Sequence, residues 1–203
     1  MGIKYFYTWI KNNFKDSIVN EIKEPIDVLA IDMNGLFHSS VAKLYKNNGN
    51  KNYIINYNQI PKNNLNLFKE ICNKIEQIKN NIKPKKKLLL CVDGVAGLGK
   101  INLQRQRRFK NSFENDSVFD INNFTPGTKL MDFLTKYIDW YIRNMITFNP
   151  EWQNIEIIFS NEKVQGEGEH KIIQFIKKNI LPSDNICIYG SDADIILLSL
   201  MKL

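Results

Sequence analysis

Four short apolar runs alternate along this chain with longer segments of helical periodicity, and this alternation restricts the fold more than any other feature. The runs lie in DVLAIDMN (27–34), LLLCVDG (88–94), NIEIIFS (154–160) and NICIYGSDAD (185–194). Branched residues on both sides of an extended backbone are typical of strands buried on two faces. The pattern therefore predicts an α/β fold with a mainly parallel central sheet and helices on both faces.

The segments between the predicted strands indicate helices and one loop. At 203 residues the chain is expected to form a single domain, residues 1–203. The polar, Asn-rich segment 47–64 is predicted to be an exposed loop or insertion. The start of the chain is predicted to be an amphipathic helix, and the segment 125–148 a long helix opened by Pro126 and Gly127. The other expected helices cover residues 35–45, about 65–82, 98–113, 169–180 and 195–203.

Acidic residues follow the carboxyl ends of all four predicted strands, which is the edge where open α/β sheets form their sites. Any single one of them is explained as a helix cap or a turn residue. Six carboxylates gathered in a partly desolvated cleft would repel one another unless a cation neutralised them. The six are Asp32, Asp93, Glu167, Glu169, Asp192 and Asp194.

This acidic set predicts a site for hard divalent cations. Carboxylates with hardly any His or Cys favour Mg²⁺ or Mn²⁺ over zinc. Because Mg²⁺ usually takes only one or two carboxylates, six acids indicate two ions, and paired ions are suited to hydrolysis of a phosphodiester. The spacing of Glu167 and Glu169 suggests how the site forms: Gly166 and Gly168 are expected to keep the backbone extended, so that both carboxylates point to one side before the next helix begins.

A basic helix is predicted directly after Asp93. Four of its residues fall at i, i+4, i+7 and i+8 and therefore share one face, which suits a terminal phosphate as well as it suits a solvated surface. His38, one turn beyond Asp32, is a candidate for contact with a base or phosphate. The four helical residues are Lys100, Gln104, Arg107 and Arg108.

Composition narrows the class of partner. The formal net charge of +7 favours polyanions such as nucleic acid. Three widely spaced cysteines indicate neither a disulfide framework nor a zinc cluster. With no signal peptide or membrane-length apolar run in the sequence, we expect a cytoplasmic protein that is not attached to a membrane.

Several motifs occur in a familiar order and spacing. They are MGIKYFYTWI, LAIDMNGLFH, VDGVAGLGKINLQRQRRFK, TPGTKLM, IIFSNEKVQGEGEHKI and CIYGSDADIILL. Over nearly its whole length the chain resembles the amino-terminal region of the Xrn family of 5′→3′ exoribonucleases. GEGEHK followed by DAD is the most specific part of the match.

The resemblance implies a PIN-like fold related to flap nucleases, and Mg²⁺-dependent, processive removal of nucleotides from 5′-monophosphorylated RNA in RNA decay. By motif match, the six acids named above would be metal ligands. The four residues of the basic helix would form a 5′-phosphate pocket too small for a cap or triphosphate, and His38 would stack on a base near the cut.

The chain departs from the family pattern in three places. Gly97–Gly99 stands where Pro-Arg-Ala is usual, and Lys4 stands where a proline is usual. The sequence ends at Leu203, whereas the family continues to another metal-binding aspartate, further helices and an aromatic wall. We therefore expect an incomplete nuclease domain whose remaining carboxyl-terminal portion belongs to a longer chain or a separate polypeptide.

Two other functions fit the same residues. One is a non-catalytic, truncated module that binds RNA, and the other is a structure-specific nuclease that cuts flaps or DNA ends. Retained acids favour an enzyme over a binding module, because a domain without catalysis has little reason to tolerate their repulsion.

Overall fold

A computed structural model of the chain describes residues 5–45, 64–114 and 119–200. The segment predicted to be an exposed loop, 47–64, lies outside the described residues except for Asn64. That residue is fully buried and occupies the N-cap position of the helix that follows.

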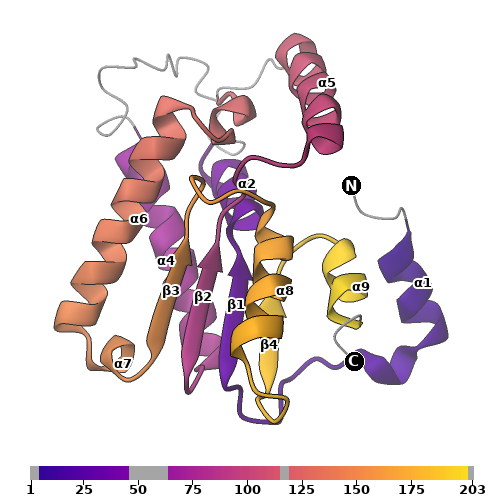
Figure 1. Ribbon diagram of the computed structural model, residues 1–203, viewed down its shortest axis with the longest axis vertical. Helices are drawn as coiled ribbons and strands as arrows, with labels where there is room; N and C mark the ends of the chain where they lie inside the picture. The colour runs from indigo at the N-terminus through magenta and orange to yellow at the C-terminus, as the bar shows by residue number, and fades with distance from the viewer. Residues whose placement is uncertain (1–4, 46–63, 115–118, 201–203) are drawn as a thin grey trace.

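The centre of the fold is a four-stranded parallel sheet with the strand order β3-β2-β1-β4 (Figure 1). In the register of the sheet, Val28 lies opposite Lys87 on one side and Ile186 on the other. All the strands point the same way, so their carboxyl ends meet at one edge. The strands are β1 (Val28–Asp32), β2 (Lys87–Cys91), β3 (Glu156–Ser160) and β4 (Ile186–Tyr189).

One face of the sheet is covered by three long helices and two short ones. Alternation along β1 points Leu29 and Ile31 toward this face, where they join a large apolar cluster that also contains Phe68 and the fully buried Trp152. The helices are α2 (Met33–Tyr45), α4 (Leu65–Ile82), η2 (Ile121–Phe124), α6 (Lys129–Phe148) and α7 (Pro150–Gln153).

The opposite face carries a smaller core under α8 (Gly168–Asn179), which lies in front of the sheet in Figure 1. Ile172 and Ile176 are one turn apart, so both reach the sheet, where they pack on Ala30 and Leu89. The helix α9 (Asp194–Leu200) contacts α8. Helices on both faces of a parallel sheet confirm the predicted α/β class.

The remaining helices lie at the margins of the sheet. The helix α5 (Leu98–Glu114) projects beyond its carboxyl edge, and α1 (Phe6–Asn13) with the short η1 (Lys15–Ser17) lies beyond α9 (Figure 1). Within the described residues, no helix is both long enough and apolar enough to cross a membrane.

One of the predicted helix boundaries is wrong. The helix α6 begins at Lys129 rather than at Pro126 and Gly127, because the Thr128 side chain accepts a hydrogen bond from the Met131 N–H and caps the first turn. Gly127 lies before the helix with a φ of +90°, in the region that favours glycine. Of the predicted terminal helix, residues 195–200 belong to α9, and 201–203 lie outside the described part of the chain.

Candidate active site

The structure places the predicted acids around the carboxyl edge of the sheet. Asp32 is the buried last residue of β1, and Asp93 follows β2. Glu167 is the N-cap residue of α8 and Glu169 lies in its first turn, while Asp192 and Asp194 follow β4. Five of the six acids line one cavity of about 560 Å³: Asp32, Asp93, Glu167, Glu169 and Asp192. Asp194 does not line it, but its charge acts on Glu169 and raises the pKa of that carboxyl.

The two glycines around Glu167 have different roles from each other. Gly166 has a φ of +101°, so it releases the backbone as expected. Gly168 is instead the first residue of α8, and a Cβ at this position would lie 2.6 Å from Asp32 Oδ1. The expectation that both glutamates precede the helix is therefore wrong. Glu169 is helical, and it reaches the cavity because the absence of a side chain at Gly168 lets α8 approach the acids closely.

Backbone amides and one asparagine hold the acids in place. The Gly168 N–H donates to Asp93 Oδ1 at 2.6 Å. Asn34 bridges two strands, because its Oδ1 accepts from the Asp93 N–H at 3.1 Å while its own N–H donates to Asp32 Oδ1 at 3.4 Å. Asn34 was not among the residues predicted from the sequence. A polar residue two positions after a strand-ending acid, at the carboxyl edge of the sheet, is the signal that could have identified it.

Crowding and burial make three of the acids hard to ionise in the absence of a cation. Burial, with the charges of Asp93, Asp192 and Glu169, raises the pKa of Asp32 from 3.8 to about 7. Burial also raises the pKa of Asp93, and Glu167 adds to the effect while the Gly168 hydrogen bond opposes it. The pKa of Glu169 is raised for the same reason. This repulsion is what a bound divalent cation would relieve.

The basic helix α5 contacts the acids through Lys100. Its ammonium forms an ion pair with Glu167 and lies 4.0 Å from Glu169. Arg107 lines the acidic cavity, so two of the four predicted phosphate-binding residues are at the site. The other two, Gln104 and Arg108, bond to each other along the helix, with Arg108 Nη2 donating to Gln104 Oε1 at 3.2 Å.

His38 also lines the cavity and is exposed at its rim. Its ring meets Phe124 edge to face, with centroids 5.7 Å apart. Desolvation lowers the pKa of this imidazole, although Asp93 and Asp192 oppose the shift. The ring is therefore held by an aromatic neighbour at a position where a substrate group entering the cavity would meet it.

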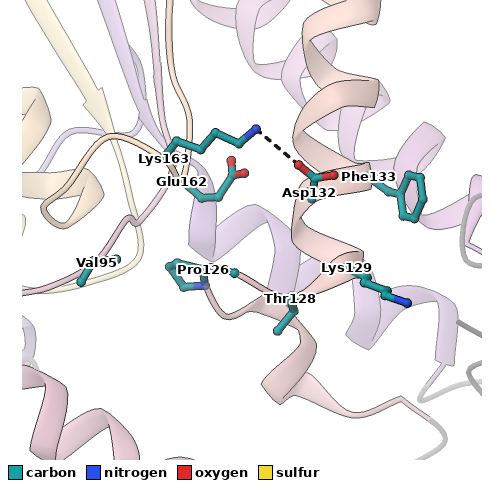
Figure 2. Close-up of a pocket in the computed structure, with 9 residues that line it drawn as sticks. Val95, Pro126, Thr128, Lys129, Asp132, Phe133, Glu162 and Lys163 are labelled. Atoms are coloured by element: carbon teal, nitrogen blue, oxygen red, sulfur yellow. Dashed lines mark ion pairs between the residues drawn. The ribbon is translucent and has the colours of Figure 1, made fainter.

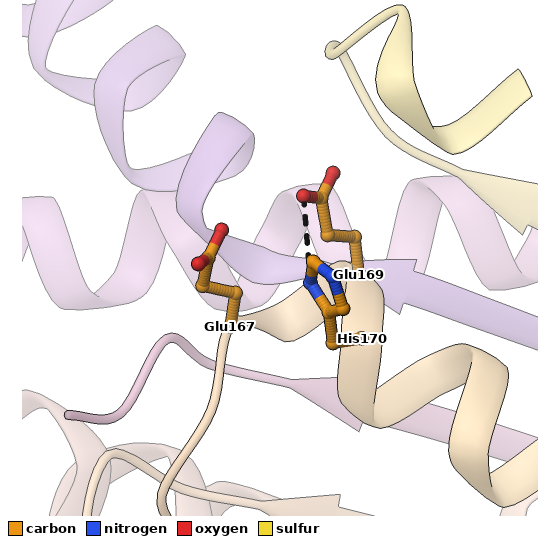
Figure 3. Close-up of side chains that lie close together, drawn as sticks. All are labelled: Glu167, Glu169 and His170. Atoms are coloured by element: carbon orange, nitrogen blue, oxygen red, sulfur yellow. Dashed lines mark ion pairs between the residues drawn. The ribbon is translucent and has the colours of Figure 1, made fainter. Parts of the chain in front are cut away.

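The donor set fits a hard cation. Ligand atoms of Glu167, Glu169 and His170 lie within 4.8 Å of one another (Figure 3). His170 Nδ1 is 3.6 Å from Glu169 Oε1, and the histidine is exposed. Five acids line the cavity, and carboxylate oxygens are the ligands that Mg²⁺ and Mn²⁺ prefer. His170 was not among the site residues predicted from the sequence, although it directly follows Glu169.

A larger cavity of about 910 Å³ lies beside the first, between the loops after β2 and β3 and the start of α6 (Figure 2). It contains none of the six predicted acids. Its own acids are Glu162 and Asp132, and Lys163 Nζ lies 3.4 Å from Asp132 Oδ1. We therefore place the candidate active site in the smaller cavity, where the acidic charge is concentrated.

A parallel sheet with helices on both faces and an acidic cavity at its carboxyl edge has the architecture of a PIN-like nuclease fold. The family model described as the XRN 5′-3′ exonuclease N-terminus matches residues 1–117 and 112–203. The chain belongs to this family, which confirms the resemblance seen in its motifs.

Individual relatives agree with this assignment. The 5′-3′ exoribonuclease 1 of Schizosaccharomyces pombe is 33% identical over 225 residues, which cover 100% of this chain and 16% of the relative. The human 5′-3′ exoribonuclease 1 is 33% identical over 98% of this chain and 12% of its own length. The 5′-3′ exoribonuclease 2 of Gallus gallus is 29% identical over 98% of this chain and 25% of its own length. The chain thus spans a quarter or less of these relatives.

Proposed function

We propose that this chain carries the nuclease centre of a metal-dependent 5′→3′ exoribonuclease that degrades 5′-monophosphorylated RNA in RNA decay. The observation that carries the proposal is the single cavity in which five strand-end acids meet Arg107 and His38. The cavity thus combines carboxylates that can bind divalent cations with a guanidinium, that of Arg107, that can bind phosphate. The relatives named as 5′-3′ exoribonucleases support the same activity and direction.

Mg²⁺ or Mn²⁺, as two ions, is the cofactor we propose. Their ligands would come from Asp32, Asp93, Glu167, Glu169, Asp192 and Asp194. Bound in this way, the ions would supply an activated water and would stabilise the leaving oxygen of the phosphodiester. The raised pKa values of Asp32, Asp93 and Glu169 support this, because a fold that crowds carboxylates leaves them in need of positive charge.

The basic side chains have a separate task in this proposal, which is to select the 5′ end. Arg107 donates to phosphate oxygens from the wall of the cavity, since a guanidinium matches that geometry. Lys100 is held by Glu167 when no other cation neutralises the glutamate. With Glu167 serving as a ligand of a divalent ion, the Lys100 ammonium would be available to bind a terminal phosphate. His38 is positioned to stack on a base beside the scissile bond.

The proposal is tested with RNA labelled at its 3′ end and carrying a 5′ monophosphate, triphosphate or hydroxyl. The purified chain is incubated with each substrate in Mg²⁺ or Mn²⁺. We expect progressive shortening of the monophosphate substrate alone. Asp192→Ala should abolish shortening but leave RNA binding nearly intact. Asp139→Ala, at an exposed position on α6, is the matched control and should behave as the wild type.

Each alternative function has its own result in this assay. RNA binding without shortening, in wild type and variants alike, would indicate a non-catalytic binding module. Equal cleavage of the 5′-hydroxyl substrate, or preference for a DNA flap, would indicate a structure-specific nuclease. Loss of binding together with cleavage in a folded Asp192→Ala variant would contradict the metal-ligand role of this acid.

A further inference from the structure

Lys171 is a buried lysine in the first turns of α8, with 8% of its surface exposed. Its ammonium makes two hydrogen bonds, both to main-chain carbonyls. Nζ donates to the Val92 oxygen at 2.8 Å and to the Asn161 oxygen at 2.9 Å. A buried lysine is costly unless its charge is compensated, so its place in the fold calls for a physical reason.

The two carbonyls belong to different loops that leave the carboxyl edge of the sheet. Val92 directly precedes Asp93 after β2, and Asn161 directly follows β3. Lys171 itself lies two residues after Glu169. One ammonium therefore joins the segment that carries Asp93, the neighbouring loop and the helix that carries Glu169.

The same two loops are also joined through their backbones. The Gly94 N–H donates to the Gly166 oxygen at 2.8 Å, and the Gly166 N–H donates to the Val95 oxygen at 2.9 Å. The loops approach so closely that a Cβ on Gly94 would lie 1.9 Å from the Val164 oxygen. Lys171 bonds to the first residue of each loop, so without its ammonium the buried Val92 carbonyl would lose this donor, and the Asn161 carbonyl would keep the Val164 N–H at 3.3 Å.

Charge gives Lys171 a second effect on the acids. Burial lowers the pKa of its ammonium, while Cys91, Asp93 and Glu162 oppose the shift. In return, the ammonium lowers the pKa of Asp93 and favours its ionised form.

We propose that Lys171 is a positioning residue for the cation site: through the Val92 and Asn161 carbonyls it holds Asp93 at a fixed distance from Glu167 and Glu169. The inference rests on the proposed function, since it assumes that these acids bind divalent ions. Lys171 does not itself contact substrate in this arrangement. Residues behind metal ligands typically change ion affinity by about 10-fold to 100-fold when they are replaced.

The test measures Mn²⁺ binding by isothermal titration calorimetry in Lys171→Met, which keeps the length of the side chain but removes its donors. We expect Mn²⁺ affinity to fall by about 10-fold or more. Lys177→Met is the matched control, because Lys177 is an exposed lysine of the same helix. The Mn²⁺ affinity of this variant should equal that of the wild type. Unchanged affinity in a folded Lys171→Met variant would overturn the inference.

A rescue experiment separates a positioning role from simple packing. In Lys171→Ala, added propylammonium should restore Mn²⁺ affinity, or folding if the variant is unfolded, and 1-propanol should not. Equal rescue by both compounds, or by neither, would overturn the inference. Mn²⁺ binding by an Asp192→Ala variant distinguishes failure of the inference about Lys171 from failure of the proposed function. If it also binds Mn²⁺ as the wild type does, the acids are not the ion site at all.

Discussion

The acid most affected by its surroundings is Asp32, and replacing it with asparagine tests the electrostatic account of the site. Asparagine has nearly the same shape but carries no charge. It retains an oxygen that can accept the hydrogen bond from the Asn34 N–H. With divalent ions removed, we expect Asp32→Asn to be more stable than the wild type at neutral and alkaline pH.

The size of the effect follows from the shift in pKa. The carboxyl titrates at 3.8 in its ordinary state and at about 7 in the folded protein. One pKa unit corresponds to about 1.4 kcal/mol, so the fully ionised carboxylate costs the folded state about 4 kcal/mol. Because the folded state keeps its proton to higher pH, this loss begins as pH rises above 3.8 and is complete above about 7.

The assay is urea unfolding in a chelator, at a series of pH values on both sides of this window, for the wild type and Asp32→Asn. The difference in free energy of unfolding should grow with pH toward about 4 kcal/mol in favour of the variant. Saturating Mg²⁺ should reverse the order, because the ion stabilises the wild type and loses a ligand in the variant. Asp139→Asn, at an exposed acid of α6, is the control.

A difference that stays constant with pH would refute the reasoning, because it would mean that Asp32 ionises as easily in the folded chain as in the unfolded one. A wild type that remains less stable than the variant in saturating Mg²⁺ would refute its second part. The cavity would then tolerate its acids without using them for cations.

Three further substitutions test separate parts of the structure. Lys100→Met removes the ammonium that competes for the acids, so calorimetry should show tighter Mn²⁺ binding, while discrimination between 5′-monophosphate and 5′-hydroxyl RNA should decline. Gly168→Ala puts a Cβ 2.6 Å from Asp32 Oδ1, so Mn²⁺ affinity should fall although alanine favours helix. Trp152→Phe removes the 2.9 Å hydrogen bond to Glu76 Oε2, so urea unfolding should show a loss of about 1–3 kcal/mol with Mn²⁺ affinity unchanged.

The opposite outcome of each of these three experiments would show which part of the reasoning is wrong. Weaker Mn²⁺ binding in Lys100→Met would show that the lysine supports the ions instead of competing with them. Normal binding in Gly168→Ala would show that α8 can move away from Asp32 without harm to the site. A change of ion affinity in Trp152→Phe would show that the amino-terminal edge of the sheet influences the cavity, although no contact described above links the two.

The arrangement of the acids was predictable because the signals that set it are local. Each apolar run ends in an acid or is followed by one before the next helix begins, and parallel strands bring their ends to one edge. Asp32 and Asp93 illustrate this, since they come together although 60 residues separate them. The helix boundary at Gly168 was not predictable in this way. In the sequence, a glycine at this position suggests a break in the helix. In the structure, the missing side chain allows α8 to pack closely against Asp32.

Contacts between side chains distant in sequence were also beyond a reading of the sequence. The periodicity of the basic helix accounts for the bond between Arg108 and Gln104, which are four residues apart, but it cannot show that Lys100 bonds to Glu167. The contacts of Lys171 could not be predicted from the sequence for the same reason. In the sequence it is one more lysine beside a histidine, and only the fold brings it under the two loop carbonyls.

The strand order has a consequence for the making of the protein on the ribosome. β1 is the first strand to be synthesised, yet one of its edges is paired only by β4, the last. Asp192 and Asp194 emerge directly after that closing strand. Under the proposed function, the acidic cavity of a growing chain is therefore incomplete until β4 and the two aspartates after it have been synthesised. Until that point the chain lacks part of the centre that we propose for the cleavage of RNA.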